Sequence, residues 1–148
     1  MTRTIGPAFN ALETVRFIET ARSLVNVRWR HQGRDARGVD CAGLVVYALR
    51  TMGRPVEDAL GYGRLPYRGR LELLMRANLG DPLPKVSLRP GDVPLMRARG
   101  TAPCHCGILV EYRLGGFGMI HAHAPDRMVV EHRLDQDWID RITEVYRP

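Results

Sequence analysis

The stretch GVDCAGLVVYALRTMG (residues 38–53) constrains the fold of this chain more than any other segment. Its apolar residues recur at helical spacing and form a wide stripe, which predicts a buried helix. Asp40 can cap the first turn, because a carboxylate there accepts a hydrogen bond from an unpaired backbone amide. Gly53 and Pro55 are typical of the far end of a helix. A buried helix is therefore expected to begin at Cys41.

The rest of the chain shows helical spacing first and strand spacing afterwards. Helices are predicted over residues 11–24, where Asn10 and Glu13 resemble a capping box, and over 71–79. Residues 26–39 are polar and rich in arginine, as expected of a loop. Strands are expected in LRPGDVPLM, in residues 105–112, and in MIHAHA, MVVEHRL and RITEVYR, with a glycine turn at 115–118 and a turn or short helix at 135–139. This order indicates an α+β fold in which N-terminal helices pack on a small antiparallel sheet, in one domain spanning residues 1–148.

The net charge of the chain limits the classes of binding partner that we expect. Its net charge is +6, and Lys85 is the only lysine, so arginine supplies nearly all of the positive charge. A basic surface favours nucleic acid, anionic lipid or an acidic polymer such as the cell wall. No basic tract is interleaved with aromatic residues, and no window approaches the roughly 20 apolar residues that span a bilayer, so neither nucleic-acid binding nor membrane insertion is expected. The N-terminus lacks the apolar core of a signal peptide, which predicts a protein made in the cytoplasm.

Cys41 can be read in three ways: as core filling, as a metal ligand or as a nucleophile. A thiol at a helix N-terminus faces unpaired amides and the positive end of the helix dipole, and both favour the thiolate. A cysteine nucleophile also needs a base within reach and a group that orients the base. His105 and His121, on consecutive predicted strands, can supply these two functions if the helix packs against the sheet. The sequence does not fix the register that would bring them together.

A zinc site is the alternative from another class of function. Soft and borderline ligands are concentrated in the predicted hairpin, at Cys104, Cys106, His121 and His123. Against this, a C-H-C sequence on a strand points alternate ligands to opposite faces. A zinc site would also leave Cys41 unexplained.

Three blocks in order, GVDCAGLV, HCGILV and MIHAHA, resemble the NlpC family of papain-like cell-wall cysteine peptidases. That family shows a D-C-[SA]-G-L block, an H-x-G-I block and a hydrophobic-His-Ala block. ETARSLV, RWRHQGR and LRPGDVPLM support the resemblance, which covers most of residues 12–124. The wording RHQGRDARGVDCAGLV is most similar to members encoded with bacteriophage tail genes and gene transfer agents.

The resemblance implies a papain-like fold and hydrolysis of amide bonds in peptidoglycan stem peptides. Cys41 would be the nucleophile, His105 the general base and acid, and His121 the residue that orients it, with His123 as a second candidate for the orienting role. The Cys41 amide would contribute to the oxyanion hole. No metal or organic cofactor is expected.

The same resemblance implies partners and a location. The expected partners are peptidoglycan and the tail or baseplate proteins of a phage-like particle, which would carry the enzyme to the wall of a target cell. A non-catalytic structural component of the tail tip is the alternative that keeps the same fold.

Two positions depart from the family pattern. Many members carry a tyrosine where this chain has Trp29, whose indole has a donor but no hydroxyl. Cys106 follows His105 directly, and strand alternation predicts that it faces the core. Trp29, Arg30 and Arg34 are the candidate substrate-binding residues, because an arginine-rich loop beside the nucleophile suits an anionic substrate.

Overall fold

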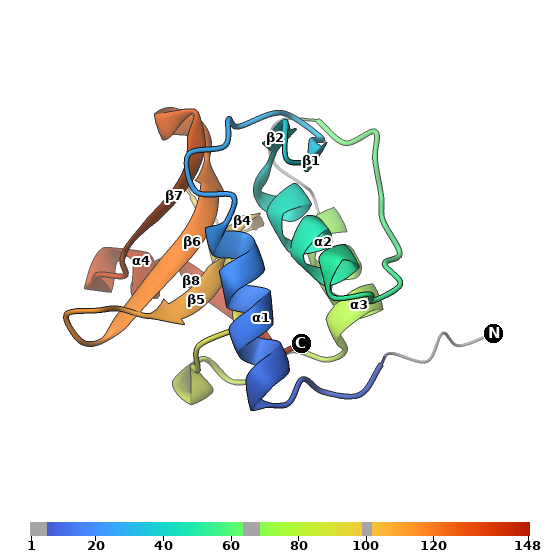
Figure 1. The fold of residues 1–148 in the computed structure, drawn as a ribbon. Coiled ribbons are helices and arrows are strands. Elements are labelled where there is room, and N and C mark those ends of the chain that lie inside the picture. Colours follow the sequence, from blue (N-terminus) through green and yellow to red (C-terminus); the bar gives the residue numbers. More distant parts are fainter. Residues whose placement is uncertain (1–5, 64–68, 99–101) are drawn as a thin grey trace.

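A computed structural model of the chain describes residues 6–63, 69–98 and 102–148. Four α-helices and eight strands occur in these ranges (Figure 1). The helices are α1 (Ala11–Arg22), α2 (Cys41–Thr51), α3 (Arg70–Leu79) and α4 (Gln136–Arg141). The strands are β1 (Arg34–Asp35), β2 (Gly38–Val39), β3 (Val93–Arg97), β4 (Pro103–Cys106), β5 (Ile108–Glu111), β6 (Phe117–His123), β7 (Met128–Arg133) and β8 (Ile142–Tyr146). Short 3₁₀ turns cover Lys85–Ser87 and Ala124–Asp126.

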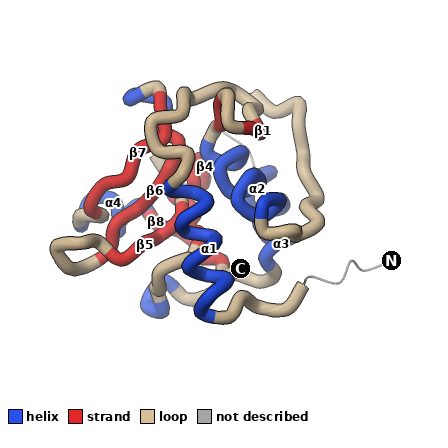
Figure 2. Tube along the Cα trace, in the orientation of Figure 1, coloured by secondary structure: helices blue, strands red, loops and turns tan. Residues whose placement is uncertain are grey.

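Helices α1, α2 and α3 form one layer and the strands form a second layer beside it (Figures 1 and 2). Helices α1 and α2 lie side by side, and α2 packs on β4 and β6 while α1 contacts β5. Helix α3 packs against β4 and β8, and α4 lies against β3. Helices α1, α2 and α3 lie on one side of the antiparallel strands and α4 lies on the other (Figure 1), and the segregation of helices and strands is the α+β arrangement that the order of elements predicts.

The strands form two small sheets, where a single sheet was expected. One sheet has the order β4-β3-β8 and the other β5-β6-β7, and both are antiparallel. The predicted strand over residues 105–112 is divided at Gly107 into β4 and β5, which belong to different sheets. A side chain at Gly107 would press on Met119, whose Sδ would lie 2.8 Å from the added Cβ. Glycine therefore allows the chain to cross from one sheet to the other at this point.

Helix α2 is the centre of the core, as its apolar stripe predicts. Eight of its residues are buried, and the main hydrophobic cluster surrounds them with Phe17 of α1, Leu71 of α3 and strand residues such as Ile120. Each fully buried aliphatic side chain of this kind contributes about 1.5–3 kcal/mol relative to an exposed one. The position of Cys41 is thus fixed by a helix that is held from several sides.

The predicted loop between α1 and α2 is held to the sheet by its backbone. The Asn26 amide donates to the carbonyl of Val129, and the Trp29 amide donates to the carbonyl of Arg127, each at 2.9 Å. Farther along, Arg34–Asp35 and Gly38–Val39 pair as the short hairpin β1-β2, which was not predicted. Within the described ranges no helix is long and apolar enough to cross a membrane.

The turn in LRPGDVPLM is held by the buried carboxylate of Asp92. This carboxylate accepts a 2.8 Å hydrogen bond from the Arg89 amide and is bound by two nitrogens of Arg147, at 2.8 and 2.9 Å. A bidentate arginine gives the buried charge a partner of matching geometry. The start of β3 is thereby tied to the end of β8.

Candidate active site

Asp40 caps α2, as the sequence predicts, and places Cys41 at the first helical position. The Asp40 Oδ1 atom accepts a 2.8 Å hydrogen bond from the amide of Gly43, and the carboxylate is almost completely buried. Cys41 is 5% exposed. Its thiol therefore lies at the end of α2 where unpaired amides and the helix dipole favour a negative charge.

The cap carries more hydrogen bonds than a helix end requires. Asp40 Oδ2 accepts from the Gln32 amide at 2.8 Å and from the Tyr62 hydroxyl at 2.5 Å. Burial, and next to it the charge of Cys41, raise the pKa of Asp40, while the hydrogen bond from Tyr62 and the charge of Arg34 oppose the rise. The carboxylate is satisfied by donors from several parts of the chain, which fixes the start of α2 in place.

Arg34 lies beneath the site, not on its surface. Its side chain is 11% exposed, and its guanidinium binds Asp40 at 3.0 Å, Asp58 at 2.9 Å and the Tyr62 hydroxyl at 2.8 Å. A guanidinium with these partners holds the loop and the cap together. The structure thus gives Arg34 a supporting role, and its contact with substrate stays a prediction.

The other two candidate substrate residues lie nearer to solvent. Arg30 is exposed, and its side chain passes close to Gly38. Trp29 is half-buried, and its ring stacks on that of His31 with 6.3 Å between centroids. Their contacts with substrate stay predictions.

Gly43, in the D-C-A-G block, is required by close packing. A Cβ at this position would collide with the carbonyl oxygen of Gly33, in the loop before β1. A Cβ at Gly33 would in turn collide with the carbonyl of Gly38. The D-C-A-G block therefore supplies both Cys41 and the glycine that lets this loop pack closely on the first turn of α2.

Strand β4 lies directly against the start of α2. The Cys106 thiol donates a 3.3 Å hydrogen bond to the carbonyl oxygen of Cys41 and is fully buried. Its hydrogen bond with the Cys41 side chain, together with burial, raises the pKa of Cys106 well above the usual range, so it remains a thiol and a donor. Cys106 is a core residue, as predicted, and it also contacts the proposed nucleophile. His105 precedes it on the same strand.

His105 is bound by His121 across the two sheets. Its Nε2 lies 2.7 Å from Nδ1 of His121, which is completely buried on β6. Because Nε2 is engaged, Nδ1 is the ring nitrogen of His105 that remains to serve a thiol. The geometry also separates the two candidates for the orienting role: His123 binds Asp126 at 2.7 Å, and His121 holds His105.

A third histidine, which lies outside the three sequence blocks, extends this pair. Nε2 of His121 lies 2.7 Å from Nε2 of His132 on β7, and Nδ1 of His132 lies 2.7 Å from the carbonyl oxygen of Arg133. In the register of β6 and β7, His121 pairs with Val130, so His132 is its diagonal neighbour on the same face. The alternation in MVVEHRL predicts a strand that contains His132, but only the register of β6 and β7 shows that His132 lies beside His121.

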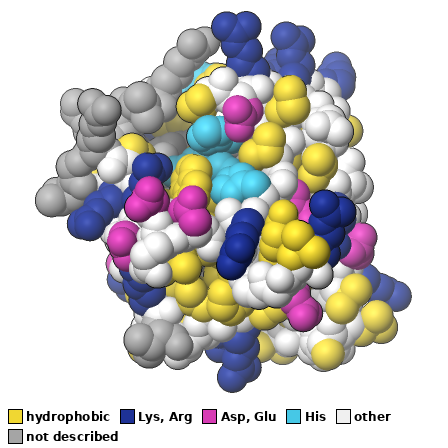
Figure 3. Space-filling model, turned by 90° about the vertical axis from the view of Figure 1, so that its left-hand side faces the viewer, with side chains coloured by type: hydrophobic (Ala, Val, Ile, Leu, Met, Phe, Trp, Pro, Cys, Tyr) yellow, Lys and Arg dark blue, Asp and Glu magenta, His cyan; other side chains and the backbone are white. Residues whose placement is uncertain are grey.

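Trp138 of α4 covers the group of histidines. Its ring centroid lies 5.1 Å from that of His121 and 5.4 Å from that of His132. Histidine side chains are gathered in one patch on this face of the molecule (Figure 3). Burial, followed by the charges of His105, His132 and His123, lowers the pKa of His121 to about 2, so this ring is neutral at any physiological pH.

The zinc alternative has no support in this geometry. The described part of the chain contains no group of three or more histidine, cysteine, aspartate or glutamate side chains arranged to hold a metal ion. Cys106 is turned toward Cys41, and both ring nitrogens of His121 are hydrogen-bonded to other histidines. The proposed ligands therefore do not converge.

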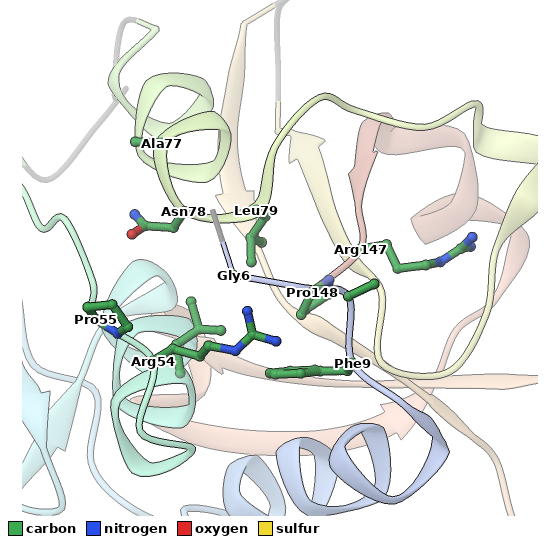
Figure 4. Close-up of a pocket in the computed structure, with 11 residues that line it drawn as sticks. Gly6, Phe9, Arg54, Pro55, Ala77, Asn78, Leu79, Arg147 and Pro148 are labelled. Atoms are coloured by element: carbon green, nitrogen blue, oxygen red, sulfur yellow. The ribbon is translucent and has the colours of Figure 1, made fainter. Parts of the chain in front are cut away.

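A cavity of about 150 Å³ lies at the other end of α2 (Figure 4). Phe9, Arg54, Asn78 and Pro148 are among the residues that line it, and the guanidinium of Arg54 lies 4.5 Å from the centroid of the Phe9 ring. None of its lining residues belongs to the group around Cys41, so this cavity is separate from the candidate active site.

Comparison with known proteins gives a family and a fold. The profile of the NlpC/P60 family matches residues 26–147, whereas no curated protein sequence matches the chain. Similar solved structures include an NlpC/P60 family protein from Bacillus cereus (TM-score 0.68, 18% identity, 95% of this chain and 41% of that chain) and the NlpC/p60 domain of the peptidoglycan hydrolase SagA (0.62, 20%, 91% and 98%). A third is RipD from Mycobacterium tuberculosis (0.61, 16%, 91% and 96%), described as a non-catalytic NlpC/p60 domain protein adapted to peptidoglycan binding.

These structures are similar in fold, and the α+β, papain-like arrangement of helices on small antiparallel sheets is confirmed. The chain spans less than half the length of the Bacillus cereus protein and 44% of a Staphylococcus aureus lipoprotein-like member. The identities are low, so the functions of these proteins do not transfer with their folds.

Proposed function

The chain belongs to the NlpC/P60 family, and we propose that it is a cysteine endopeptidase that hydrolyses amide bonds in peptidoglycan stem peptides. One observation carries the proposal: His105 is held by His121 at 2.7 Å, on a strand whose next residue, Cys106, binds Cys41 at the start of α2. An imidazole base needs a partner that orients it, and His121 supplies that partner on the strand next to the start of α2, which supports the proposal.

The reaction that we propose has two stages. The Cys41 thiol gives its proton to His105, and the thiolate attacks the carbonyl carbon of the scissile amide, where the oxyanion that forms accepts a hydrogen bond from the Cys41 backbone amide. His105 protonates the leaving amine, the C–N bond breaks, and a thioester remains. A water molecule then gives a proton to His105 and attacks the thioester, which releases the new carboxylate and restores the thiol and imidazole pair.

The charge of the chain suits this substrate. Stem peptides carry carboxylates, and the net charge of +6 favours association with an anionic polymer. Arg30 is exposed in the loop that leads to Cys41, and in the proposal it contacts a substrate carboxylate.

Digestion of purified peptidoglycan tests the activity. Wild type and Cys41→Ala are incubated with it, and soluble muropeptides are identified by mass spectrometry. Cys104→Ala is the matched control, because Cys104 lies on the same strand as Cys106 and is half-buried. We expect products from wild type and the control and none from Cys41→Ala. Equal profiles for wild type and Cys41→Ala would remove the peptidase function.

A non-catalytic wall-binding protein is the second candidate, and the similarity to RipD favours testing it. Sedimentation with insoluble peptidoglycan separates the two functions. Binding by wild type and Cys41→Ala alike, without products from either, would replace the enzyme with a binding protein.

We also propose that the protein is made in the cytoplasm and carried at the tip of a phage-like tail, where it opens the wall of a target cell. The support is the wording RHQGRDARGVDCAGLV, which is similar to members encoded with tail genes. Mass spectrometry of purified particles from the source cells tests this, with detection at a few copies per particle expected. Absence from particles that contain the other tail proteins would overturn it.

A further inference from the structure

Three imidazoles form a continuous chain of hydrogen bonds that ends on the protein backbone. The chain runs from His105 to His121 and on to His132, each step at 2.7 Å, and closes on the carbonyl oxygen of Arg133 at 2.7 Å. It joins strands β4, β6 and β7 and so crosses from one sheet to the other. His132 lies outside the three sequence blocks, yet it occupies the last position in this series of hydrogen-bonded histidines.

The carbonyl oxygen of Arg133 fixes which nitrogen donates in each hydrogen bond of this series. A carbonyl oxygen only accepts, so Nδ1 of His132 must carry its proton. A neutral imidazole has one N–H, and Nε2 of His132 is therefore an acceptor for the N–H on Nε2 of His121. It follows that Nδ1 of His121 is an acceptor as well, and that it receives the N–H on Nε2 of His105.

We propose that His132 is a positioning residue that holds His121 in the tautomer able to accept from His105. The inference rests on the proposed peptidase function. With Nδ1 of His121 as an acceptor, the imidazolium form of His105 keeps a hydrogen-bond partner on its Nε2. In the proposal, the Nδ1 atom of His105 is then free to exchange a proton with the Cys41 thiol or the leaving amine. In the opposite tautomer an N–H of His121 would point at the N–H of His105, and the imidazolium would lose its stabilisation.

The surroundings of the chain are consistent with a neutral relay. Burial lowers the pKa of His121 to about 2, so it does not itself take the charge. The titratable groups around it are His105 on β4, His123 on β6 and His132 on β7, and α4 contributes the uncharged Trp138. Charged side chains on or beside these elements are Glu131 and Arg133, which flank His132 on β7, Asp126, which is paired with His123, and Arg141, whose guanidinium lies over Trp138 at 4.9 Å. Glu131 is itself paired with Arg22 of α1. On the side of the helix, Asp40 and Cys41 lie next to the strand that carries His105.

Nitrogen-15 NMR of the histidine rings tests the direction of the chain without any substrate. Long-range proton–nitrogen correlations distinguish the two neutral tautomers. In the wild type at pH 8 we expect a proton on Nδ1 of His132 and on Nε2 of His121. A proton on Nδ1 of His121 or on Nε2 of His132 would overturn the proposal, and this measurement requires no variant to fold.

Kinetics of three variants test the role. His132→Ala removes the acceptor for His121, whereas His132→Gln places an amide oxygen near the position of the lost Nε2. We expect His132→Ala to lower kcat about ten-fold with little change in KM, and to move the alkaline limb of the pH profile down by about one unit. His132→Gln should restore most of both. Met128→Ala is the control, because Met128 is an exposed residue on the same strand as His132 and belongs to none of the hydrogen bonds between the histidines, and its profile should match wild type.

The outcomes separate this inference from the peptidase function. An active wild type with an unchanged pH profile in His132→Ala would overturn the role of His132 and leave the enzyme intact. A wild type that releases no muropeptides would overturn the enzyme and, with it, the role of His132. Iodoacetamide alkylation of Cys41 against pH gives a second readout: a rate profile that is the same in wild type and His132→Ala would also overturn the role.

Discussion

The hydroxyl of Tyr62 donates a 2.5 Å hydrogen bond to the buried carboxylate of Asp40, from a loop that follows α2 to the residue that begins it. The same hydroxyl accepts from Arg34 at 2.8 Å. The start of the helix that carries Cys41 is therefore fixed by residues on both sides of it in the sequence. Trp29 stands where many family members have a tyrosine, so the loop before Cys41 lacks that hydroxyl. Tyr62 supplies a different hydroxyl, which binds Asp40 next to Cys41.

Tyr62→Phe removes the hydroxyl and keeps the ring. Asp40 then loses one donor while it stays buried, and we expect the free energy of unfolding to fall by about 1–3 kcal/mol. Urea unfolding followed by circular dichroism measures the change. Tyr47→Phe is the control, because the Tyr47 hydroxyl makes no hydrogen bond in the described part of the chain. Equal losses in the two variants would contradict the supporting role of Tyr62.

Arg34→Met and Arg30→Gln distinguish support from substrate binding. Arg34 is paired with carboxylates that are almost fully buried, and removing one partner of such a pair costs about 3–5 kcal/mol of stability. Arg30 is exposed, so its replacement should change stability by less than about 0.5 kcal/mol. We expect Arg30→Gln instead to raise KM for peptidoglycan fragments that bear carboxylates. A KM identical to that of wild type would exclude Arg30 from substrate binding.

Gly43→Ala tests the close approach of the loop to α2. The added methyl group would collide with the carbonyl of Gly33, and we expect a loss of about 2–3 kcal/mol together with reduced activity, because the first turn of the helix must move. Gly53→Ala is the comparison: it has open space but a φ of 77°, so strain alone should cost about 1 kcal/mol. Thermal unfolding of both variants gives the difference, and a smaller effect at Gly43 would refute the packing argument.

The free energy of unfolding should fall as the pH is lowered, because His121 stays neutral in the folded protein and takes up a proton when the protein unfolds. Its pKa is about 2 in the folded chain against about 6.5 when unfolded, so between these values the unfolded state binds a proton that the native state does not. The stabilisation is complete above pH 6.5 and is lost as the pH falls toward 2. From pH 7 to pH 5 this group alone removes about 2 kcal/mol.

Urea unfolding at the two pH values measures this loss. His121→Asn should lack that share of the pH dependence, while His123→Asn on the same strand should keep it. The same slope in wild type and His121→Asn would show that other groups cause the effect.

Cys106 should assist the thiolate of Cys41. The Cys106 thiol stays protonated and interacts with the Cys41 side chain, so Cys106→Ala removes a donor beside the Cys41 sulfur and raises the pKa of Cys41. We expect iodoacetamide alkylation of Cys41 at pH 6 to slow about three-fold, the effect of one weak hydrogen bond. Cys104→Ala is the control on the same strand and should leave the rate unchanged. An unchanged rate in Cys106→Ala would make Cys106 a packing residue alone.

The sequence by itself determined the buried helix with its Asp40 cap, the order of helices and strands, and the small set of candidate residues for the proposed chemistry. These features depend on contacts within a few residues: the spacing of apolar side chains, a cap three residues from its amide, and glycine at turns. For the same reason the family could be identified from three short blocks around Cys41, His105 and His121.

Only the tertiary structure decided how distant residues meet. It divided one predicted strand at Gly107 between two sheets, placed Arg34 in a buried ion pair, and brought Tyr62 to Asp40 and His132 to His121. Each of these depends on strand register or on how a loop returns, and a change of one residue in register turns every side chain of a strand to the other face. Local pattern does not contain that choice, because the free energy that makes it comes from packing the whole core at once.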